Sequence, residues 1–141
     1  MDDRFVEDLK SRVDIVDIVR KYAELKKMGV EVISISTDTI FSHLMFKKTS
    51  PTVKNVKYPM ASDPNGAVSR AYGVYMEDKG LNQRGRFIIN PKGTIMAVEV
   101  MVGPVGRNVD ELIRQIKAMQ AVARNRGKAA PAGWKPGDKL I

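Results

Sequence analysis

Short segments rich in β-branched residues alternate with amphipathic helical segments along this chain, and that order constrains its fold more than any other feature. The spacing of apolar residues predicts helix over residues 4–28, ended by a glycine. A β-branched strand follows at residues 30–36, and its composition is typical of a strand buried inside a sheet. A helix that Thr37 or Asp38 can cap then extends towards Pro51.

A second group of elements follows in the C-terminal part of the chain. Residues 56–60 predict a short strand, and residues 67–72 predict a short helix. Strands at residues 84–90 and 94–101 flank a Pro-Lys-Gly turn, which suits a hairpin. A long amphipathic helix begins after Asn108, which forms its cap. A parallel strand–helix–strand unit followed by an antiparallel hairpin predicts an α/β layer fold.

No cysteine occurs among the 141 residues, and this excludes whole classes of chemistry for the chain. Thiol nucleophiles, disulfides, Cys-ligated zinc and iron–sulfur clusters all need a sulfur atom that no other side chain supplies. The only histidine, His43, lies beside an apolar helical stripe without neighbouring thiols or spaced carboxylates. We therefore expect a structural or surface role for His43, and neither a metal nor a cofactor.

Positive charge is concentrated near the C-terminal end. Residues 107–141 hold eight Lys or Arg against three Asp or Glu, which is +5 of a total net charge of +8. Clustered basic residues can bind the phosphates of nucleic acids, but the same residues equally suit the solvated face of a helix. We favour the solvated face and expect no nucleic-acid partner.

The chain has no sequence signal for a membrane. No window approaches the ~18 consecutive apolar residues of a membrane span, and the opening Met-Asp-Asp-Arg lacks the pattern of a secretory signal. We expect a cytoplasmic protein with no membrane partner.

Five stretches together resemble the typical two-cysteine peroxiredoxins of the alkyl hydroperoxide reductase and thiol-specific antioxidant family. They occur in family order and with family spacing. The resemblance implies a thioredoxin-like α/β sheet flanked by helices and truncated at its N-terminal side, belonging to a family of antioxidant, peroxide-reducing oxidoreductases. The stretches are LKKMGVEVISISTDTIFSH (25–43), YPMASDPNGAVSRAYGV (58–74), RGRFIINPKG (84–93), VGRNVDELIRQIKAMQ (105–120) and APAGWKPGD (130–138).

The resemblance also implies a catalytic constellation, of which one member is present. The family's peroxide-stabilising arginine falls on Arg84, but no nucleophilic thiolate precedes it. The family's resolving-cysteine position falls on Ala130. Trp134 matches a tail residue that packs on a partner subunit in the family. Read from the residues alone, Arg84 could instead pair with a carboxylate such as Glu99 across the hairpin.

Residues 5–28 resemble the opening helices of bacterial DNA primase, without the zinc ligands that follow there. Any amphipathic helix of this length would suit the position equally well. The sequence thus divides into a helical N-terminal segment (1–21), a peroxiredoxin-like domain (22–126) and an extended C-terminal tail (127–141).

These observations together predict an inactive peroxiredoxin homologue that acts as a noncatalytic interaction protein. Truncation should leave part of the sheet uncovered, so we expect a homo-oligomer, such as a dimer, or association with peroxiredoxin subunits. The alternative is a basic nucleic-acid-associated module with a primase-like start.

Overall fold

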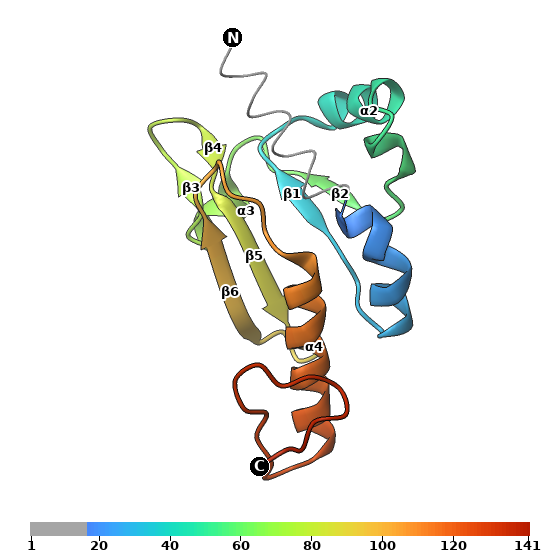
Figure 1. Ribbon diagram of the computed structural model, residues 1–141. Helices are drawn as coiled ribbons and strands as arrows, with labels where there is room; N and C mark the ends of the chain where they lie inside the picture. Colours follow the sequence, from blue (N-terminus) through green and yellow to red (C-terminus); the bar gives the residue numbers. More distant parts are fainter. Residues whose placement is uncertain (1–16) are drawn as a thin grey trace. The chain divides into compact units, whose positions relative to one another are not determined.

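A computed structural model describes residues 17–141 of the chain. The chain divides into two compact units, of which the first ends at Arg107 and the second runs from Asn108 to Ile141. Helices and strands alternate from β1 to β3 in the first unit, and three further strands follow (Figure 1), which agrees with the predicted α/β fold. No helix within residues 17–141 is long and apolar enough to span a membrane.

A parallel pair of strands forms the first half of this unit. Residues 17–27 are helical, and Gly29 follows them with φ +73°, a conformation that favours glycine at a helix end. Strand β1 (Ser34–Ser36) leads into helix α2 (Ile40–Thr49) and a short 3-10 turn, η1 (Val53–Asn55). Strand β2 (Met60–Ser62) then returns and pairs with β1 in parallel.

Two antiparallel hairpins form the other half. Helix α3 (Ala67–Ala71) precedes a small hairpin of β3 (Tyr75–Met76) and β4 (Leu81–Asn82). The larger hairpin pairs β5 (Arg84–Ile89) with β6 (Ile95–Met101), with a register shift at Ile88 and Ile89. The three strand pairs form separate two-stranded sheets.

The core of the first unit is centred on η1 and the residues that follow it. Val53, Val56 and Tyr58 are buried together, and the Tyr58 ring meets the edge of the Tyr22 ring with centroids 5.6 Å apart. Burial also raises the pKa of Tyr58. Partly buried apolar side chains complete this core: Ile18, Val19, Tyr22, Val32, Phe46 and Met60.

Three sequence expectations differ from the structure. The β-branched segment 30–36 was expected inside a sheet, yet Ile33 and Ile35 are 62% and 43% exposed. Within residues 17–141, β1 also has a neighbouring strand on one edge only, so it does not lie inside a sheet. The strand expected at residues 56–60 forms instead at β2, because Val56 and Tyr58 enter the core. The β3–β4 hairpin was not expected, because its strands are too short to show a period.

The second unit consists of helix α4 (Val109–Arg124) and the segment that follows it. The Asn108 side chain accepts a hydrogen bond from the Glu111 N–H, which confirms the predicted cap. The segment closes on itself, because Ala129 and Ile141 exchange two backbone hydrogen bonds of 2.7 and 2.9 Å. The sequence had predicted an extended tail here; the closed loop is built by turns at the Pro and Gly positions of residues 131–137.

Candidate functional site

A polar cluster forms where β1 meets the start of α2. Ser36 Oγ donates to Asp38 at 2.8 Å and lies 2.7 Å from His43 Nε2. Thr39 begins the helix, and its hydroxyl accepts from the Ser42 N–H at 3.2 Å. The cap is therefore Thr39, one or two residues after the expected Asp38 or Thr37, because the helix begins at Ile40 and the Thr39 hydroxyl reaches the N–H three residues ahead.

Hydrogen bonding in this cluster fixes the direction of its protons. The single proton of Ser36 goes to Asp38, so His43 Nε2 must donate to the Ser36 oxygen. His43 is 9% exposed, and its Nδ1 is buried without a hydrogen-bond partner among the described residues. A Ser-His-Asp triad needs the reverse order, with the carboxylate on histidine and histidine accepting from serine. This order of donors is opposite to that of a catalytic triad, and a structural role remains the expectation for His43.

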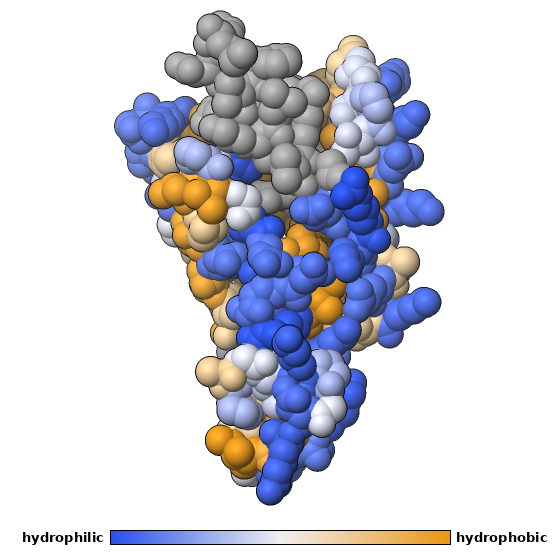
Figure 2. Space-filling view, viewed as in Figure 1, coloured by the Kyte–Doolittle hydropathy of each residue, from blue (hydrophilic) through white to orange (hydrophobic). Residues whose placement is uncertain are grey.

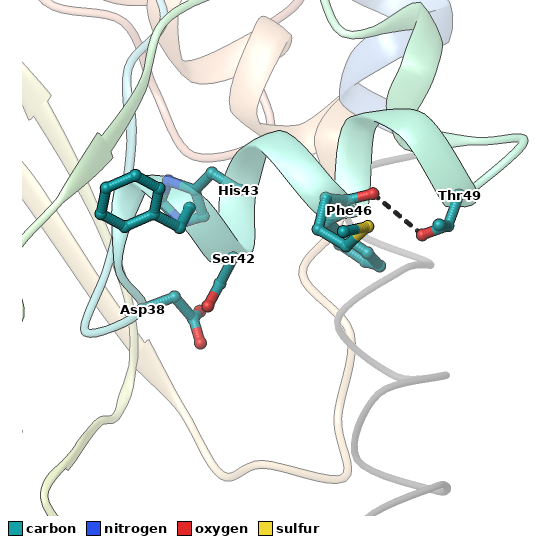
Figure 3. Close-up of a pocket in the computed structure, with 7 residues that line it drawn as sticks. Asp38, Ser42, His43, Phe46 and Thr49 are labelled. Atoms are coloured by element: carbon teal, nitrogen blue, oxygen red, sulfur yellow. Dashed lines mark hydrogen bonds between the residues drawn. The ribbon is translucent and has the colours of Figure 1, made fainter.

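An open pocket of about 570 Å³ lies along one face of α2 beside this cluster. Figure 3 shows Asp38 and Ser42 at one end of the helix and Phe46 and Thr49 at the other. The pocket is lined by hydroxyl and carboxylate groups together with the exposed side chains of Phe41 and Met45. Within residues 17–141 no group of three His, Cys, Asp or Glu side chains could hold a metal ion.

Arg84 begins β5, where its register partner on β6 is Met101. The alternation of side chains along a strand places Arg84 and Arg86 on one face of the hairpin. Arg86 forms an ion pair with Glu99 at 2.9 Å, and its side chain is only 12% exposed. The register places Glu99 directly opposite Arg86, one step along the same face from Arg84.

A second polar arrangement holds the start of α3. Asp63 is buried, and it accepts from the Ser69 hydroxyl at 2.6 Å and the Ser69 N–H at 2.8 Å. These bonds, with one from the Val68 N–H, lower the pKa of the Asp63 carboxyl, chiefly through the Ser69 hydroxyl. The bonds from Asp63 to Ser69 span six residues, further than the bonds within a single turn.

A surface arginine completes the neighbourhood of α3. The Arg70 guanidinium lies 4.1 Å from the centroid of the Tyr75 ring and contacts Glu77 at 2.5 and 2.9 Å. The Glu77 hydrogen bond raises the pKa of Arg70, and Arg70 lowers the pKa of Glu77. Arg70 joins α3 to β3 and holds no position open for a ligand.

The two tail positions lie in the second unit. Trp134 is 6% exposed, and its indole N–H donates to the Asp138 carbonyl at 3.0 Å. Arg114 of α4 donates to the Trp134 carbonyl at 2.8 Å and pairs with Glu111. Ala130 offers a methyl group at the position where the resemblance places a resolving cysteine.

Sequence reasoning missed Ser36 as a partner of His43. The two residues are seven positions apart and lie on different elements, so no local period links them. The alternation of β1 was the available signal, since Ile33 and Ile35 leave Ser34 and Ser36 on the opposite face.

Sequence models of two families match the chain. The AhpC/TSA family matches residues 11–98, and the C-terminal domain of 1-Cys peroxiredoxin matches residues 118–141. The first match begins inside the segment that resembles primase, so it extends the similarity to peroxiredoxins beyond residue 22 towards the N-terminus.

Curated relatives cover nearly the whole chain. It is 43% identical over 128 residues to alkyl hydroperoxide reductase C of Amphibacillus xylanus, covering 91% of this chain and 68% of that protein. It is 45% identical over 132 residues to the selenocysteine-containing peroxiredoxin PrxU of Peptoclostridium acidaminophilum, covering 91% of this chain and 65% of that protein. The chain thus spans about two thirds of these relatives.

Solved structures show the same fold. Enterococcus faecalis AhpC superposes with a TM-score of 0.82 at 36% identity, covering 86% of this chain and 72% of that one. The reduced 2-Cys peroxiredoxin of Plasmodium vivax superposes with a TM-score of 0.88 at 27% identity, covering 93% of this chain and 68% of that one. The predicted thioredoxin-like α/β fold is confirmed.

Proposed function

The chain belongs to the AhpC/TSA family of peroxiredoxins, and from this premise we propose that it is a noncatalytic member that acts through self-association. The absence of cysteine from all 141 residues carries the proposal. The name of the PrxU relative states that it contains selenocysteine, and this chain has neither sulfur nor selenium in a nucleophilic side chain. Arg84 then occupies the peroxide-stabilising position without a nucleophile to assist.

No hydroxyl group of the cluster at α2 replaces the thiol. Ser36 gives its proton to Asp38 and accepts from His43, so no base draws a proton from it towards an attacking oxygen. A serine hydroxyl is also scarcely ionised at neutral pH and forms no sulfenic acid. This supports the proposal that the 141-residue chain does not turn over peroxide.

Strand β6 supports self-association. Within the described residues β6 pairs only with β5, so its other edge offers free backbone groups. Met96, Val98 and Val100 share one face of the strand and are 45–55% exposed. Apolar residues line the side of the molecule where Figure 1 draws β6 (Figure 2). An open edge joined to an apolar face is typical of a surface that another chain covers.

Helix α2 offers a second apolar surface. Ile40, Phe41, Leu44 and Met45 are all between 57% and 75% exposed. A helix on the surface of a monomer normally turns such residues towards its own core. One of these surfaces is enough for a dimer, and use of both would allow a larger assembly.

The primary test measures peroxide consumption with a thioredoxin-type reducing system while sedimentation velocity follows the mass of the purified chain. We expect no turnover and a dimer or larger species. Turnover that Arg84→Ala abolishes would show a cysteine-free active site and contradict the proposal. A monomer at all concentrations would contradict the self-association part alone.

A charge at the centre of β6 tests which surface associates. We expect Val98→Lys to weaken the association at least about tenfold, because it places an ammonium in a desolvated contact. Thr94→Lys is the matched control, since it adds the same charge in the turn before β6. Equal effects of the two variants would assign association to another surface.

Several finer assignments remain part of this proposal. They are association with peroxiredoxin subunits, a cytoplasmic location, an interface role for Trp134, descent of Ala130 from a resolving cysteine, and the division at residues 21/22 and 126/127. The primase resemblance remains a hypothesis, and the first half of residues 5–28 lies outside the described residues. The comparisons do not favour the nucleic-acid-associated alternative.

A further inference from the structure

Methionine supplies all the sulfur of this chain, which has eight methionines and no cysteine. A peroxide oxidises a thiolate before a thioether where both are present, so in this chain the exposed thioethers are the sulfur atoms that meet it. Among the described methionines only Met45 and Met96 are exposed, at 60% and 50%, and the others are partly buried. These two side chains are therefore the ones that a peroxide in solution reaches first.

Met96 belongs to the apolar face of β6. Side chains alternate along a strand, so Met96, Val98 and Val100 share one face, and all three are exposed. Ala97 and Glu99, which alternate with them, are partly buried. The Met96 sulfur thus lies within the surface that supports self-association.

The turn between β5 and β6 holds a hydrogen-bond donor against this sulfur. Asn90 Oδ1 accepts from the N–H groups of Lys92 and Thr94, both at 3.0 Å, and these bonds fix which way the amide faces. Asn90 Nδ2 donates to Met96 Sδ at 3.5 Å. A thioether is only a weak acceptor, whereas a sulfoxide oxygen is polar and accepts more strongly. Asn90 would therefore gain a better partner when Met96 is oxidised.

Oxidation would change the character of the β6 face. A sulfoxide replaces a flexible apolar side chain with a polar, chiral one, which disrupts methionine contacts between chains. The Asn90 N–H satisfies only part of the hydrogen-bonding capacity of the new oxygen. Contact with the apolar side chains of a second copy would strip water from the rest, and that desolvation costs free energy.

We propose that Met96 is a peroxide-oxidation site at which sulfoxide formation dissociates the assembly of this chain. A sulfur lone pair attacks one oxygen of a hydroperoxide, and the S–O bond forms as the O–O bond breaks. The leaving oxygen takes the hydroperoxide proton and departs as water or an alcohol, so sulfur loses the two electrons that the peroxide gains. The dissociation rests on the proposed self-association, whereas the oxidation does not.

The first test treats the purified 141-residue chain with hydrogen peroxide and follows each methionine by peptide mass spectrometry. We expect Met96 in dilute chain to gain one oxygen faster than partly buried Met119. Concentrated chain should protect Met96, because association covers it. Sedimentation of the oxidised chain should show association weakened at least about tenfold. An unmodified Met96 under conditions that oxidise Met45 would overturn the inference.

Leucine variants identify which methionine controls the assembly. Met96→Leu keeps an apolar side chain of similar volume but cannot form a sulfoxide. It should associate within about twofold of wild type and stay associated after peroxide. Met45→Leu is the matched control, because it removes the other exposed thioether and should dissociate as wild type does. Equal dissociation of Met96→Leu and wild type after peroxide would overturn the inference.

Reversal separates sulfoxide formation from other oxidative damage. Methionine sulfoxide reductases of both epimer specificities, supplied with a thiol reductant, should return oxidised wild type to its original association. No recovery once Met96 has lost its added oxygen would overturn the inference. An assembly that survives full oxidation of Met96 would overturn it while leaving self-association in place. A monomer before peroxide is added would contradict self-association itself and, with it, the dissociation.

Discussion

Asp63 shows how one side chain can organise a turn and a helix start. Its carboxylate reaches six residues ahead to the hydroxyl and N–H of Ser69, and it is buried by the segment that it holds. A carboxylate that accepts several hydrogen bonds is stabilised in its charged form, so its folded pKa lies below the unfolded value. The bond network therefore stabilises the fold only while Asp63 is ionised.

Acidification should expose this dependence. Because the folded pKa of Asp63 is lowered, its stabilising contribution is complete above the unfolded pKa of about 3.9 and is lost as pH falls through the folded pKa. We expect Asp63→Asn to lower the urea midpoint at pH 6 and to lose less stability than wild type between pH 6 and pH 3. Asp78→Asn, at an exposed turn residue, is the control. Equal pH profiles for wild type and Asp63→Asn would contradict the role.

Gly66 offers a second test at the same scale. It has φ +68°, and an added Cβ would clash with the Tyr75 ring. Gly66→Ala should cost about 1–3 kcal/mol from backbone strain, with a further loss from the clash. Gly29→Ala has a similar φ of +73° with nothing within 4 Å, so it isolates the backbone contribution. Chemical denaturation of both variants should rank Gly66→Ala as the less stable.

At the scale of elements, the sequence predicted the order of helices and strands but not which strands lack neighbours. The long helix α4 and the β5–β6 hairpin show clear periods, and both were expected within two residues of their bounds. The β-branched composition of β1 predicted a buried strand. Composition indicates that a segment can form a strand, but it does not show how many neighbouring strands that strand will have. The Ser36–His43 contact stayed hidden for a related reason, since it depends on how two elements pack.

Within the second unit, Arg114 links α4 to the closed loop. It donates to the Trp134 carbonyl and pairs with Glu111, whose hydrogen bond raises the pKa of Arg114. Arg114→Ala should loosen the loop and shift the emission of Trp134 to longer wavelength as the indole meets water. Trp134 is the only tryptophan, so the signal is unambiguous. Arg124→Ala, at an exposed arginine of the same helix, is the control; a shift of equal size there would contradict the role of Arg114.

At the scale of the whole molecule, resemblance predicted more than periodicity did. The family and the thioredoxin-like fold followed from five stretches in order, and the comparisons confirm both. Resemblance could not predict the side-chain partners, because the Arg86–Glu99 ion pair depends on the register of one hairpin. The absence of a thiol could be read directly from the sequence, because counting a residue type needs no structure.

The core of the first unit should respond strongly to a small change. Val53 is fully buried among side chains from several elements, so Val53→Ala removes two methyl equivalents and leaves a cavity. We expect a loss of about 2 kcal/mol in the free energy of unfolding, measured by urea denaturation. Val102→Ala, at a side chain 69% exposed, should change it by less than about 0.5 kcal/mol. A similar loss at both positions would argue against this core.

The exposed Ile33 and Ile35, with the exposed apolar residues of β6 and α2, have a consequence for handling the protein. Dyes that fluoresce on apolar surface normally report the loss of tertiary packing. This chain presents such surface in its native state, so the dye should already be bright before any heating. A melting curve recorded that way would begin from a high baseline and understate the transition, whereas the indole emission of Trp134 is free of that artefact.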